Sequence, residues 1–299
     1  MIITRLSGGL GNQMFQYVFG LAQARRKGTT LKMDLSAYQT GQEKRSLSLD
    51  AFKIKSPAAT REDFKAIGVP SWDSNGFLSR ARRKIFRMKE ERKPLNERRA
   101  FLEPRFTYCS EVLEMGADAF FIGDWQSEKY FLDVANEVRA EFTVKELSSA
   151  GKRVRDDIVS KSGGTPVSLH VRRGDYVSDA NAASKHGALP VEYYQAAWKL
   201  ISEKAPNARV YIFSDDIEWC RENLSFIGNQ VMVSGQGTNA AEDIILMSLC
   251  SHHIIANSSF SWWGAWLDPK TDKIVIVPKQ WFKTTADTKD LIPSSWIRI

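Results

Sequence analysis

The sequence has no apolar run of about 18 residues or more, which excludes a helix long enough to cross a bilayer. Its first residues, MIITRLSGG, lack the apolar stretch of a secretory leader, so we expect a cytoplasmic protein. Cysteine is scarce, and the three thiols at Cys109, Cys220 and Cys250 are scattered, without metal-ligand spacing. Reduced thiols in a cytosolic protein are the simplest interpretation.

Positive charge is in excess in one segment only. The chain holds 42 Lys and Arg against 35 Asp and Glu, and residues 80–99 account for ten of the former and three of the latter. The remainder is therefore balanced, which argues against a basic nucleic-acid-binding protein, since no recognition motif is present either. The segment fits a solvated helix or loop. With Leu78, Ile85, Phe86 and Met88, it also fits peripheral contact with an anionic membrane or a phosphate-bearing acceptor.

The order of apolar and amphipathic segments predicts an α/β protein. A strand at 2–6, a glycine loop, a helix near 12–27 and a strand at 29–34 start a parallel sheet. Residues 40–115 show no clear pattern. We expect further strands at 119–125, 166–171, 209–213, 230–233, 252–256 and 273–277, and further helices near 130–142, 190–204, 216–224 and 241–251.

The segment KSGGTP, residues 161–166, is the best candidate for a domain boundary. We therefore expect one Rossmann-like domain over 1–160 and a second over 161–299. The tail, 281–299, is expected to pack back on the first domain.

Polar side chains follow three strands of the predicted second sheet. Ligands of open parallel sheets bind beyond the carboxyl ends of the strands, so these clusters predict one site at one edge. The clusters are His170, Arg172, Arg173 and Asp175; Ser214, Asp215 and Asp216; and Asn257, Ser258, Ser259, Phe260 and Ser261.

Two adjacent arginines on a strand alternate sides, so only one of them can face a ligand. We expect Arg172 to bind a phosphate or carboxylate, because a guanidinium makes bidentate contacts with such groups. We expect Arg173 to pair with acidic groups inside the fold. The alternative is that the motif is only a salt-bridged strand end, with Asp175 or Asp215 as the partner.

Hydroxyls and backbone N–H groups at the start of the helix after 252–256 suit phosphate oxygens, and Ser258 and Ser259 lie there. The tryptophans of the same segment, at 262, 263 and 266, have helical spacing and are expected in the core. Asp243, early in the helix predicted at 241–251, is either an acceptor for a base edge or a first-turn partner of the helix dipole.

The N-terminal GGLGNQ is a weaker signal. Gly9 and Gly11 begin a dinucleotide fingerprint, but Met14 occupies the third glycine position and no Gly-Lys-Ser/Thr follows. The loop permits a close backbone approach, with Asn12 and Gln13 as donors. Asp215 and Asp216 have no partners at metal-ligand spacing, so no metal site is predicted.

Four motifs together resemble the bacterial α-1,2-fucosyltransferases of glycosyltransferase family eleven. They are SGGLGNQMFQY, HVRRGDYV at 170–177, FSDD at 213–216 and NSSFSWWGAW at 257–266. The resemblance implies a GT-B-type fold of two Rossmann-like domains, with GDP-L-fucose bound in the cleft between them. It implies a reaction that needs no metal. It also implies no cofactor, because GDP-fucose is a substrate.

The resemblance also assigns roles to residues. It places Arg172, Ser258 and Ser259 at the donor phosphates and Asp243 at the guanine. The remaining donor-binding residues that it implies are His170 and Phe260 in the second domain and Gly9, Gly11, Asn12 and Gln13 in the first.

The implied reaction is inverting transfer of fucose to the 2-hydroxyl of a terminal galactose, in an O-antigen or a blood-group-H-like glycan. Arg172 would meet the negative charge that grows on the departing GDP. Asp175 is the first candidate for the general base, and Asp179 or solvent is the alternative. Transfer with another linkage, such as α-1,6, stays open.

Overall fold

The computed structural model describes residues 1–73 and 76–299, and it divides into two compact units. Unit 1 consists of Met1–Phe142 and Asp287–Ile292, and unit 2 of Thr143–Ala286 and Pro293–Ile299. The boundary lies at 142/143, so the boundary expected at 161 is placed too late. Of the tail, only 287–292 belongs to unit 1.

The first sheet lies in unit 1 and is entirely parallel. Its strands run in the order β2-β1-β4-β3. The strands are β1 (Ile2–Arg5), β2 (Leu31–Asp34), β3 (Ala100–Leu102) and β4 (Ala119–Ile122).

Helix α1 (Leu10–Arg26) packs closely on one face of this sheet. The Thr4 hydroxyl donates to the Gln16 carbonyl at 3.2 Å, and the Phe19 ring meets Phe121 edge-on at 5.1 Å. A Cβ at Gly20 would lie 2.7 Å from the Leu31 side chain, which explains a glycine inside this helix. The other face is covered by α3 (Arg61–Ala66) and α4 (Phe77–Glu90).

The second sheet, in unit 2, is also parallel, with the order β10-β9-β8-β5-β6-β7. Its strands are β5 (Thr165–Val171), β6 (Ala208–Ser214), β7 (Gln230–Met232), β8 (His252–Ile254), β9 (Val275–Val277) and β10 (Ile297–Arg298). Strand β5 is buried on both faces, because helices cover both sides of the sheet. Val167, Leu169 and Val171 face one side, and Ser168 and His170 on the other side are buried as well.

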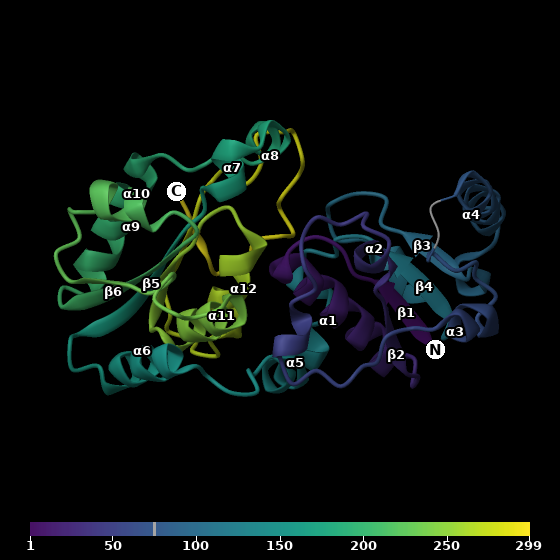
Figure 1. Ribbon diagram of the computed structural model, residues 1–299, viewed down its shortest axis with the longest axis horizontal. Helices are drawn as coiled ribbons and strands as arrows, with labels where there is room; N and C mark the ends of the chain where they lie inside the picture. The colour runs from purple at the N-terminus through teal and green to yellow at the C-terminus, as the bar shows by residue number, and fades with distance from the viewer. Residues whose placement is uncertain (74–75) are drawn as a thin grey trace. The chain divides into compact units, whose positions relative to one another are not determined.

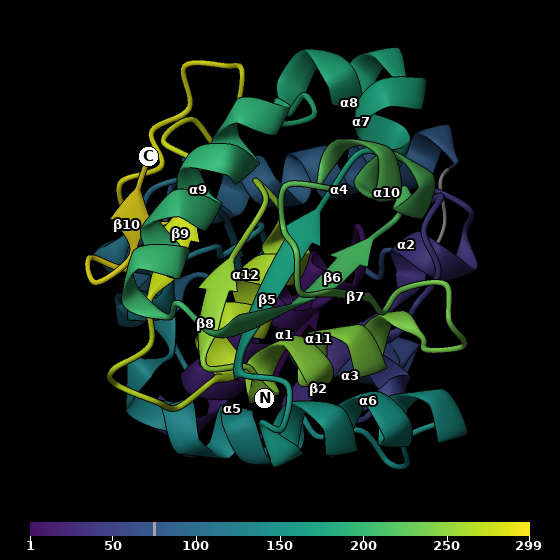
Figure 2. The ribbon, with the colours of Figure 1, turned by 90° about the vertical axis from the view of Figure 1, so that its left-hand side faces the viewer.

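Helices cover both faces of the second sheet (Figure 1 and Figure 2). The pair α9 (Val191–Lys204) and α10 (Ile217–Asn223) buries the face that carries Val167, Leu169 and Val171. The pair α11 (Ala240–Leu249) and α12 (Ser259–Leu267) lies on the opposite face. The other helices are α2 (Ser36–Gln39), α5 (Ala135–Glu141), α6 (Ser149–Ser160), α7 (Gly174–Ser178) and α8 (Ala180–Lys185).

Helix α6 belongs to unit 2 and is joined there by contacts to α11 and to β6, where Asp157 accepts from Arg209 at 2.9 Å and from Tyr211 at 3.0 Å. Asn239 and Glu242 form a capping box at the start of α11. The Glu242 carboxylate also accepts hydrogen bonds from the backbone N–H and the hydroxyl of Ser148, which caps α6. These contacts move the boundary from the glycine-rich segment at 161 to the stretch before α6.

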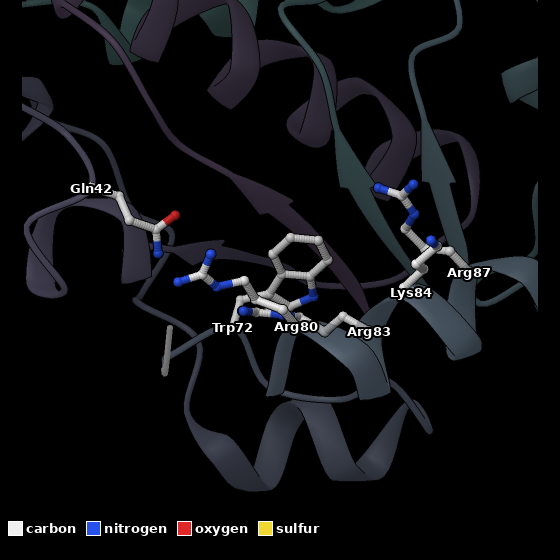
Figure 3. A pocket seen from close by; sticks show the side chains of 6 residues that line it. All are labelled: Gln42, Trp72, Arg80, Arg83, Lys84 and Arg87. Atoms are coloured by element: carbon white, nitrogen blue, oxygen red, sulfur yellow. The ribbon is translucent and has the colours of Figure 1, made fainter. Parts of the chain in front are cut away.

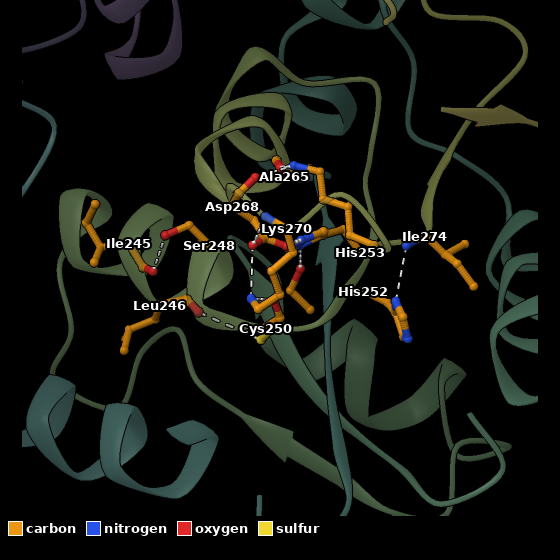
Figure 4. A network of polar contacts seen from close by, with 12 residues as sticks. Ile245, Leu246, Ser248, Cys250, His252, His253, Ala265, Asp268, Lys270 and Ile274 are labelled. Carbon is orange, nitrogen blue, oxygen red and sulfur yellow. Dashed lines mark hydrogen bonds and ion pairs between the residues drawn. The ribbon is translucent and has the colours of Figure 1, made fainter. Parts of the chain in front are cut away.

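A buried polar network ties β5, β8 and the end of α12 together (Figure 4). His253 Nδ1 lies 2.8 Å from the Ser168 hydroxyl, and Nε2 lies 3.1 Å from the Asp268 carboxylate. Burial lowers the pKa of His253 to about 4, although Asp268 opposes this, so the ring is neutral and donates through Nε2. Lys270 pairs with Asp268 at 2.9 Å, and Lys273 donates to the Ala265 carbonyl at 2.7 Å.

Among the described residues, no helix has the length and apolar character needed to span a membrane.

Candidate active site

Arg172 follows β5 at the carboxyl edge of the second sheet, where two carboxylates hold its guanidinium. Nη2 lies 2.5 Å from Asp175, and Nη1 lies 2.9 Å from Asp215, which follows β6. The salt-bridged strand end that was the alternative to an anion site is thus present in the structure. The side chain is nevertheless 22% exposed, so an anion can still reach it.

Arg173 pairs inside the fold, as expected. Its Nε lies 3.1 Å from Asp216, and its guanidinium lies 4.4 Å from the centroid of the Trp219 ring. Its backbone N–H donates to Asp215 at 2.8 Å. The side chain of Arg173 thus pairs with Asp216, while that of Arg172 pairs with Asp175 and Asp215.

The two carboxylates considered as the general base both have other partners. Asp175 is bound to Arg172, so its carboxylate already has a cationic partner. Asp179 caps α8 by accepting from the backbone of Asn181 at 2.9 Å and of Ala182 at 3.2 Å. In this arrangement Asp175 helps to position Arg172, and its role as the general base stays a prediction.

Asp243 lies in the first turn of α11 and is buried. The Ser234 hydroxyl donates to Oδ2 at 2.6 Å, while Oδ1 has no hydrogen-bond partner among the described residues. Ser234 also accepts from the Ser214 N–H at 3.1 Å, which ties Asp243 to the end of β6. Burial raises the pKa of Asp243, and the nearby hydroxyls of Ser234 and Thr238 oppose this shift. A buried acceptor without a partner is costly, so this oxygen suits a ligand that brings its own N–H groups.

Helix α12 begins at the edge that also carries Arg172. Ser258 is its N-cap, and its hydroxyl accepts from the Phe260 N–H at 3.3 Å. Ser258 is buried, and Ser259 and Phe260 are half-buried. The expected phosphate contacts of Ser258 and Ser259 stay a prediction. Trp262, Trp263 and Trp266 are buried, which confirms their predicted place in the core.

His170 points from β5 to the α12 side of the sheet, where its ring centroid lies 5.3 Å from that of Phe260. Burial, aided by the charge of Arg172, lowers the pKa of His170 to about 3. The imidazole is therefore neutral and cannot shuttle protons near neutral pH. Its Nδ1 is a buried atom without a partner among the described residues.

Tyr176 is a site residue that the sequence analysis did not single out. Its hydroxyl donates to the Asn257 carbonyl at 3.2 Å, and its ring stacks on His186 at 4.8 Å. The guanidinium of Arg172 lies 5.5 Å from the centroid of the same ring. Tyr176 thus joins the end of β5 to the start of α12. Its position inside HVRRGDYV was the available signal.

The glycine loop of unit 1 turns at Gly8, the residue before the two glycines singled out. Gly8 has φ +74°, and its carbonyl accepts from the Tyr38 hydroxyl at 2.8 Å. Gly9 is the N-cap of α1, with open space around its Cα, while Gly11 is buried in the first turn. Asn12 is half-buried and accepts from Gln126 at 3.1 Å. The open face of Gly9 leaves room for a ligand.

Gln13 was expected to donate a hydrogen bond to the ligand, but its side chain is bound within unit 1. It is fully buried, and its amide nitrogen donates to the carbonyls of Gly8 and Ser46, both at 3.0 Å. Its oxygen accepts from the Ser48 N–H at 3.0 Å. The amide fastens α1 to the 46–48 segment, which corrects its assignment as a donor to the ligand.

A strained turn lies at the carboxyl edge of the first sheet and was missed. The Glu103 carboxylate, after β3, accepts from the backbone of Asp124 at 2.6 Å and of Trp125 at 3.1 Å, after β4. Trp125 has φ +54°, rare for a tryptophan, and stacks on Phe19 at 3.8 Å. Burial raises the pKa of Glu103 to about 7. The acidic residue directly after the apolar Ala-Phe-Leu was the available signal.

No group of three or more His, Cys, Asp or Glu side chains among the described residues is placed to hold a metal ion. That transfer needs no metal stays a prediction.

The model of the family described as glycosyl transferase family 11 matches residues 83–299. An alpha-1,2-colitosyltransferase from Escherichia coli is 34% identical over the whole of this chain and 99% of its own length. The O-antigen biosynthesis glycosyltransferase WbnK, also from Escherichia coli, is 29% identical over 98% of this chain and 99% of its own. Galactoside alpha-(1,2)-fucosyltransferase 1 from Saimiri boliviensis boliviensis is 30% identical over 58% of each chain.

Two solved structures share the fold at low sequence identity. The NodZ alpha-1,6-fucosyltransferase soaked with GDP-fucose has a TM-score of 0.51 and 17% identity, over 90% of this chain and 92% of that one. A variant of FUT1 from Arabidopsis thaliana in complex with GDP has a TM-score of 0.52 and 12% identity, over 98% and 75%. The fold is of the GT-B type that the motifs implied.

Proposed function

This chain belongs to glycosyl transferase family 11, and we propose that it is a galactoside α-1,2-fucosyltransferase. In the proposed reaction, L-fucose moves from GDP-β-L-fucose to the 2-hydroxyl of a terminal galactose in an oligosaccharide. The names of the colitosyltransferase and of the Saimiri enzyme both specify an alpha-1,2 linkage, which supports this linkage over α-1,6.

One observation carries the assignment of the nucleotide: the buried Oδ1 of Asp243, which has no partner among the described residues. Guanine presents an N1–H and an N2 amino group side by side, and a carboxylate can accept from both. Uracil offers a single N–H between two carbonyls, which a carboxylate would repel. Asp243 therefore supports a guanine nucleotide.

In the proposed mechanism, the galactose hydroxyl oxygen attacks C1 of fucose while the bond from C1 to the β-phosphate oxygen breaks. The electron pair of that bond leaves with GDP, the hydroxyl proton passes to a base, and inversion gives an α linkage. Arg172 meets the charge that grows on GDP, and Asp175 and Asp215 keep its guanidinium in place. Such a fixed charge contributes roughly a few kcal/mol.

The test compares Arg172→Lys with Arg173→Lys in the purified protein. Lysine keeps the charge but loses the fork, so kcat/KM of the Arg172→Lys protein should fall by roughly a hundredfold or more. Arg173, bound to Asp216, is the matched control and should tolerate lysine better. Transfer to a galactose-terminated acceptor is followed with labelled GDP-fucose, and NMR of the product assigns the linkage. Near-normal turnover of a folded Arg172→Lys protein would contradict the clamp.

We propose that side chains supply the positive charge at the diphosphate and that no resident metal or cofactor takes part. Turnover in excess EDTA should then stay within roughly twofold of the untreated value, since Arg172 does the work that a divalent cation would otherwise do. A loss of activity that Mg²⁺ or Mn²⁺ restores would contradict this.

Colitosyl transfer is the second candidate, because the colitosyltransferase matches the full length of the chain. Colitose lacks the 3-hydroxyl of fucose, so the two donors differ by one hydrogen-bonding group. Comparing kcat/KM for GDP-fucose and GDP-colitose decides between them. A preference of roughly tenfold or more for the colitose donor would replace fucose in the proposal while leaving Arg172 and Asp243 in their roles.

A further inference from the structure

The outer face of α4, in unit 1, is apolar and exposed. Phe77 is 83% exposed, Leu78 81%, Ile85 56% and Met88 49%. Their spacing along the helix gathers them, with Ala81, on one side. Exposed apolar residues are ordinary when single, but four large ones on one helical face mark a binding surface.

Cations border this apolar face on both sides. Arg80, Lys84 and Arg87 recur at spacings of four and three residues along one border, and Arg82 and Lys89 lie seven apart along the other. The helix contains six Lys and Arg and one acidic residue, Glu90, which is buried. Burial, with a smaller contribution from the nearby Arg80, lowers the pKa of the Arg83 guanidinium.

The inner face of α4 fixes the helix on the unit. Phe86 packs against the cluster formed by Ile3, Phe64 and Phe120. The Glu90 carboxylate accepts from the Arg99 N–H at 2.5 Å, just before β3. Because the inner face is occupied, the apolar face points away from the body of unit 1.

A cavity of about 560 Å³ opens along one border of α4 (Figure 3). Arg80, Arg83, Lys84 and Arg87 line it together with Gln42 and Trp72. The Arg83 guanidinium lies 4.7 Å from the centroid of the Trp72 ring, and that of Arg5 lies 4.9 Å from it. Four cations around one cavity favour an anionic occupant, and a headgroup phosphate is of suitable size and charge.

We propose that α4 docks unit 1 on an anionic phospholipid bilayer. The apolar face lies at the boundary between headgroups and acyl chains, and the bordering cations bind phosphate headgroups, one of them in the cavity beside Trp72. Exposed apolar residues between two rows of cations are typical of helices that lie in a membrane surface. Charge complementarity and the apolar face together favour a bilayer over RNA, which would use the cations alone. The proposal is independent of the sugar that the enzyme transfers.

The first test is co-sedimentation of the full-length protein with vesicles. The parent protein should sediment with vesicles of phosphatidylcholine that contain phosphatidylglycerol and stay in the supernatant with phosphatidylcholine alone. Binding to the anionic vesicles should weaken as salt is raised, because exposed charges are screened. A parent that fails to bind anionic vesicles at low salt contradicts the proposal.

Three sets of variants separate the contributions. Leu78→Ser with Ile85→Ser removes apolar groups, and Arg82→Glu with Lys84→Glu and Lys89→Glu reverses charge. Each set should lower vesicle affinity by roughly tenfold or more. The matched control, Arg153→Glu with Lys199→Glu and Lys204→Glu, reverses three exposed cations of unit 2 and should retain the parent affinity. All replaced side chains are exposed, and transfer to a soluble acceptor should be unchanged in every set.

Depth of insertion gives a second readout. Cys109, Cys220 and Cys250 are buried, so an environment-sensitive label on Ile85→Cys would report on α4 alone. The label should be quenched by lipid-borne quenchers. A serine variant that binds like the parent, a control that loses as much as the α4 charge variant, or a label that stays in water would each overturn the proposal. Equal or tighter binding to homopolymer RNA that ignores the serine changes would assign the cations to nucleic acid instead.

Discussion

Asp243 combines burial, a fixed second oxygen and an open acceptor, and this sets what it can recognise. In Asp243→Asn, an amide N–H group can occupy the position of Oδ1 and meet the donors of guanine. We expect GDP affinity to fall by roughly tenfold or more, with little change for UDP. Calorimetric titration of both nucleotides measures this. Equal losses for GDP and UDP would indicate general damage to the site.

Glu103 gives unit 1 a dependence on pH. Its pKa is raised from 4.5 to about 7 by burial, so the protonated side chain favours the folded state. That contribution is fully present below about pH 4.5 and is lost as the pH rises through about 7. The parent protein should lose roughly 1–3 kcal/mol of unfolding free energy between pH 5 and 8 through this group. The Glu103→Gln protein, which keeps an acceptor for Asp124 and Trp125, should not show that loss. Urea unfolding at the two pH values is the measurement, and exposed Glu97→Gln is the control.

Single residues were predicted well where spacing along the chain decides which way they face. Helical spacing gave the three tryptophans their burial, and the expectation that only one of two adjacent arginines faces a ligand agrees with the internal pairing of Arg173. Gln13 could not be assigned this way, because its partners Ser46 and Ser48 lie 33 and 35 positions further along the chain. For Arg172 the sequence offered Asp175 and Asp215 as partners but did not decide between them and an anion. A motif tells which groups are available, and only the fold tells which of them are already bound.

The link between β5, β8 and the end of α12 depends on His253. In His253→Ala, Asp268 and Ser168 lose a buried partner, and the fold should lose about 3 kcal/mol of stability. His252 is the neighbouring control, since it is half-buried and accepts only from the Ile274 N–H, at 3.1 Å. His252→Ala should cost about 1 kcal/mol, because water can replace the contact. Chemical unfolding of both variants is the measurement, and equal losses would place the stabilisation elsewhere.

Strands β5 to β9 and helices α9, α10 and α11 of unit 2 could be predicted, because apolar strands there alternate with patterned helices. Helices α6, α7 and α8 and the two-residue strand β10 were not expected. In unit 1, β3 has only three residues between charged stretches, and its pattern is too short to recognise. The helix expected at 130–142 is confirmed only as α5, because 3-10 turns occupy its first part. The prediction for 80–99 left helix and loop open, since charges on most sides of α4 hide its periodicity.

For the chain as a whole, the parallel α/β class and the division into two halves were predictable from the alternation of elements. The position of the boundary was not. Glycines at 163 and 164 resemble a linker, yet they form the turn between α6 and β5 inside unit 2. The contacts that hold α6 on unit 2 join Ser148 to Glu242 and Asp157 to Arg209, pairs that no local pattern identifies.

The return of 287–292 to unit 1 makes the two units interdependent through the chain itself. Asp290 accepts from the Tyr108 N–H at 3.0 Å and pairs with the Lys129 ammonium at 2.5 Å. A few residues near the C-terminus therefore complete unit 1, which is otherwise formed by the first 142 residues. Neither unit can be cut out as one continuous gene fragment. A stop codon after Ala286 would remove Asp290, the partner of Tyr108 and Lys129, which lie more than 150 positions earlier in the chain.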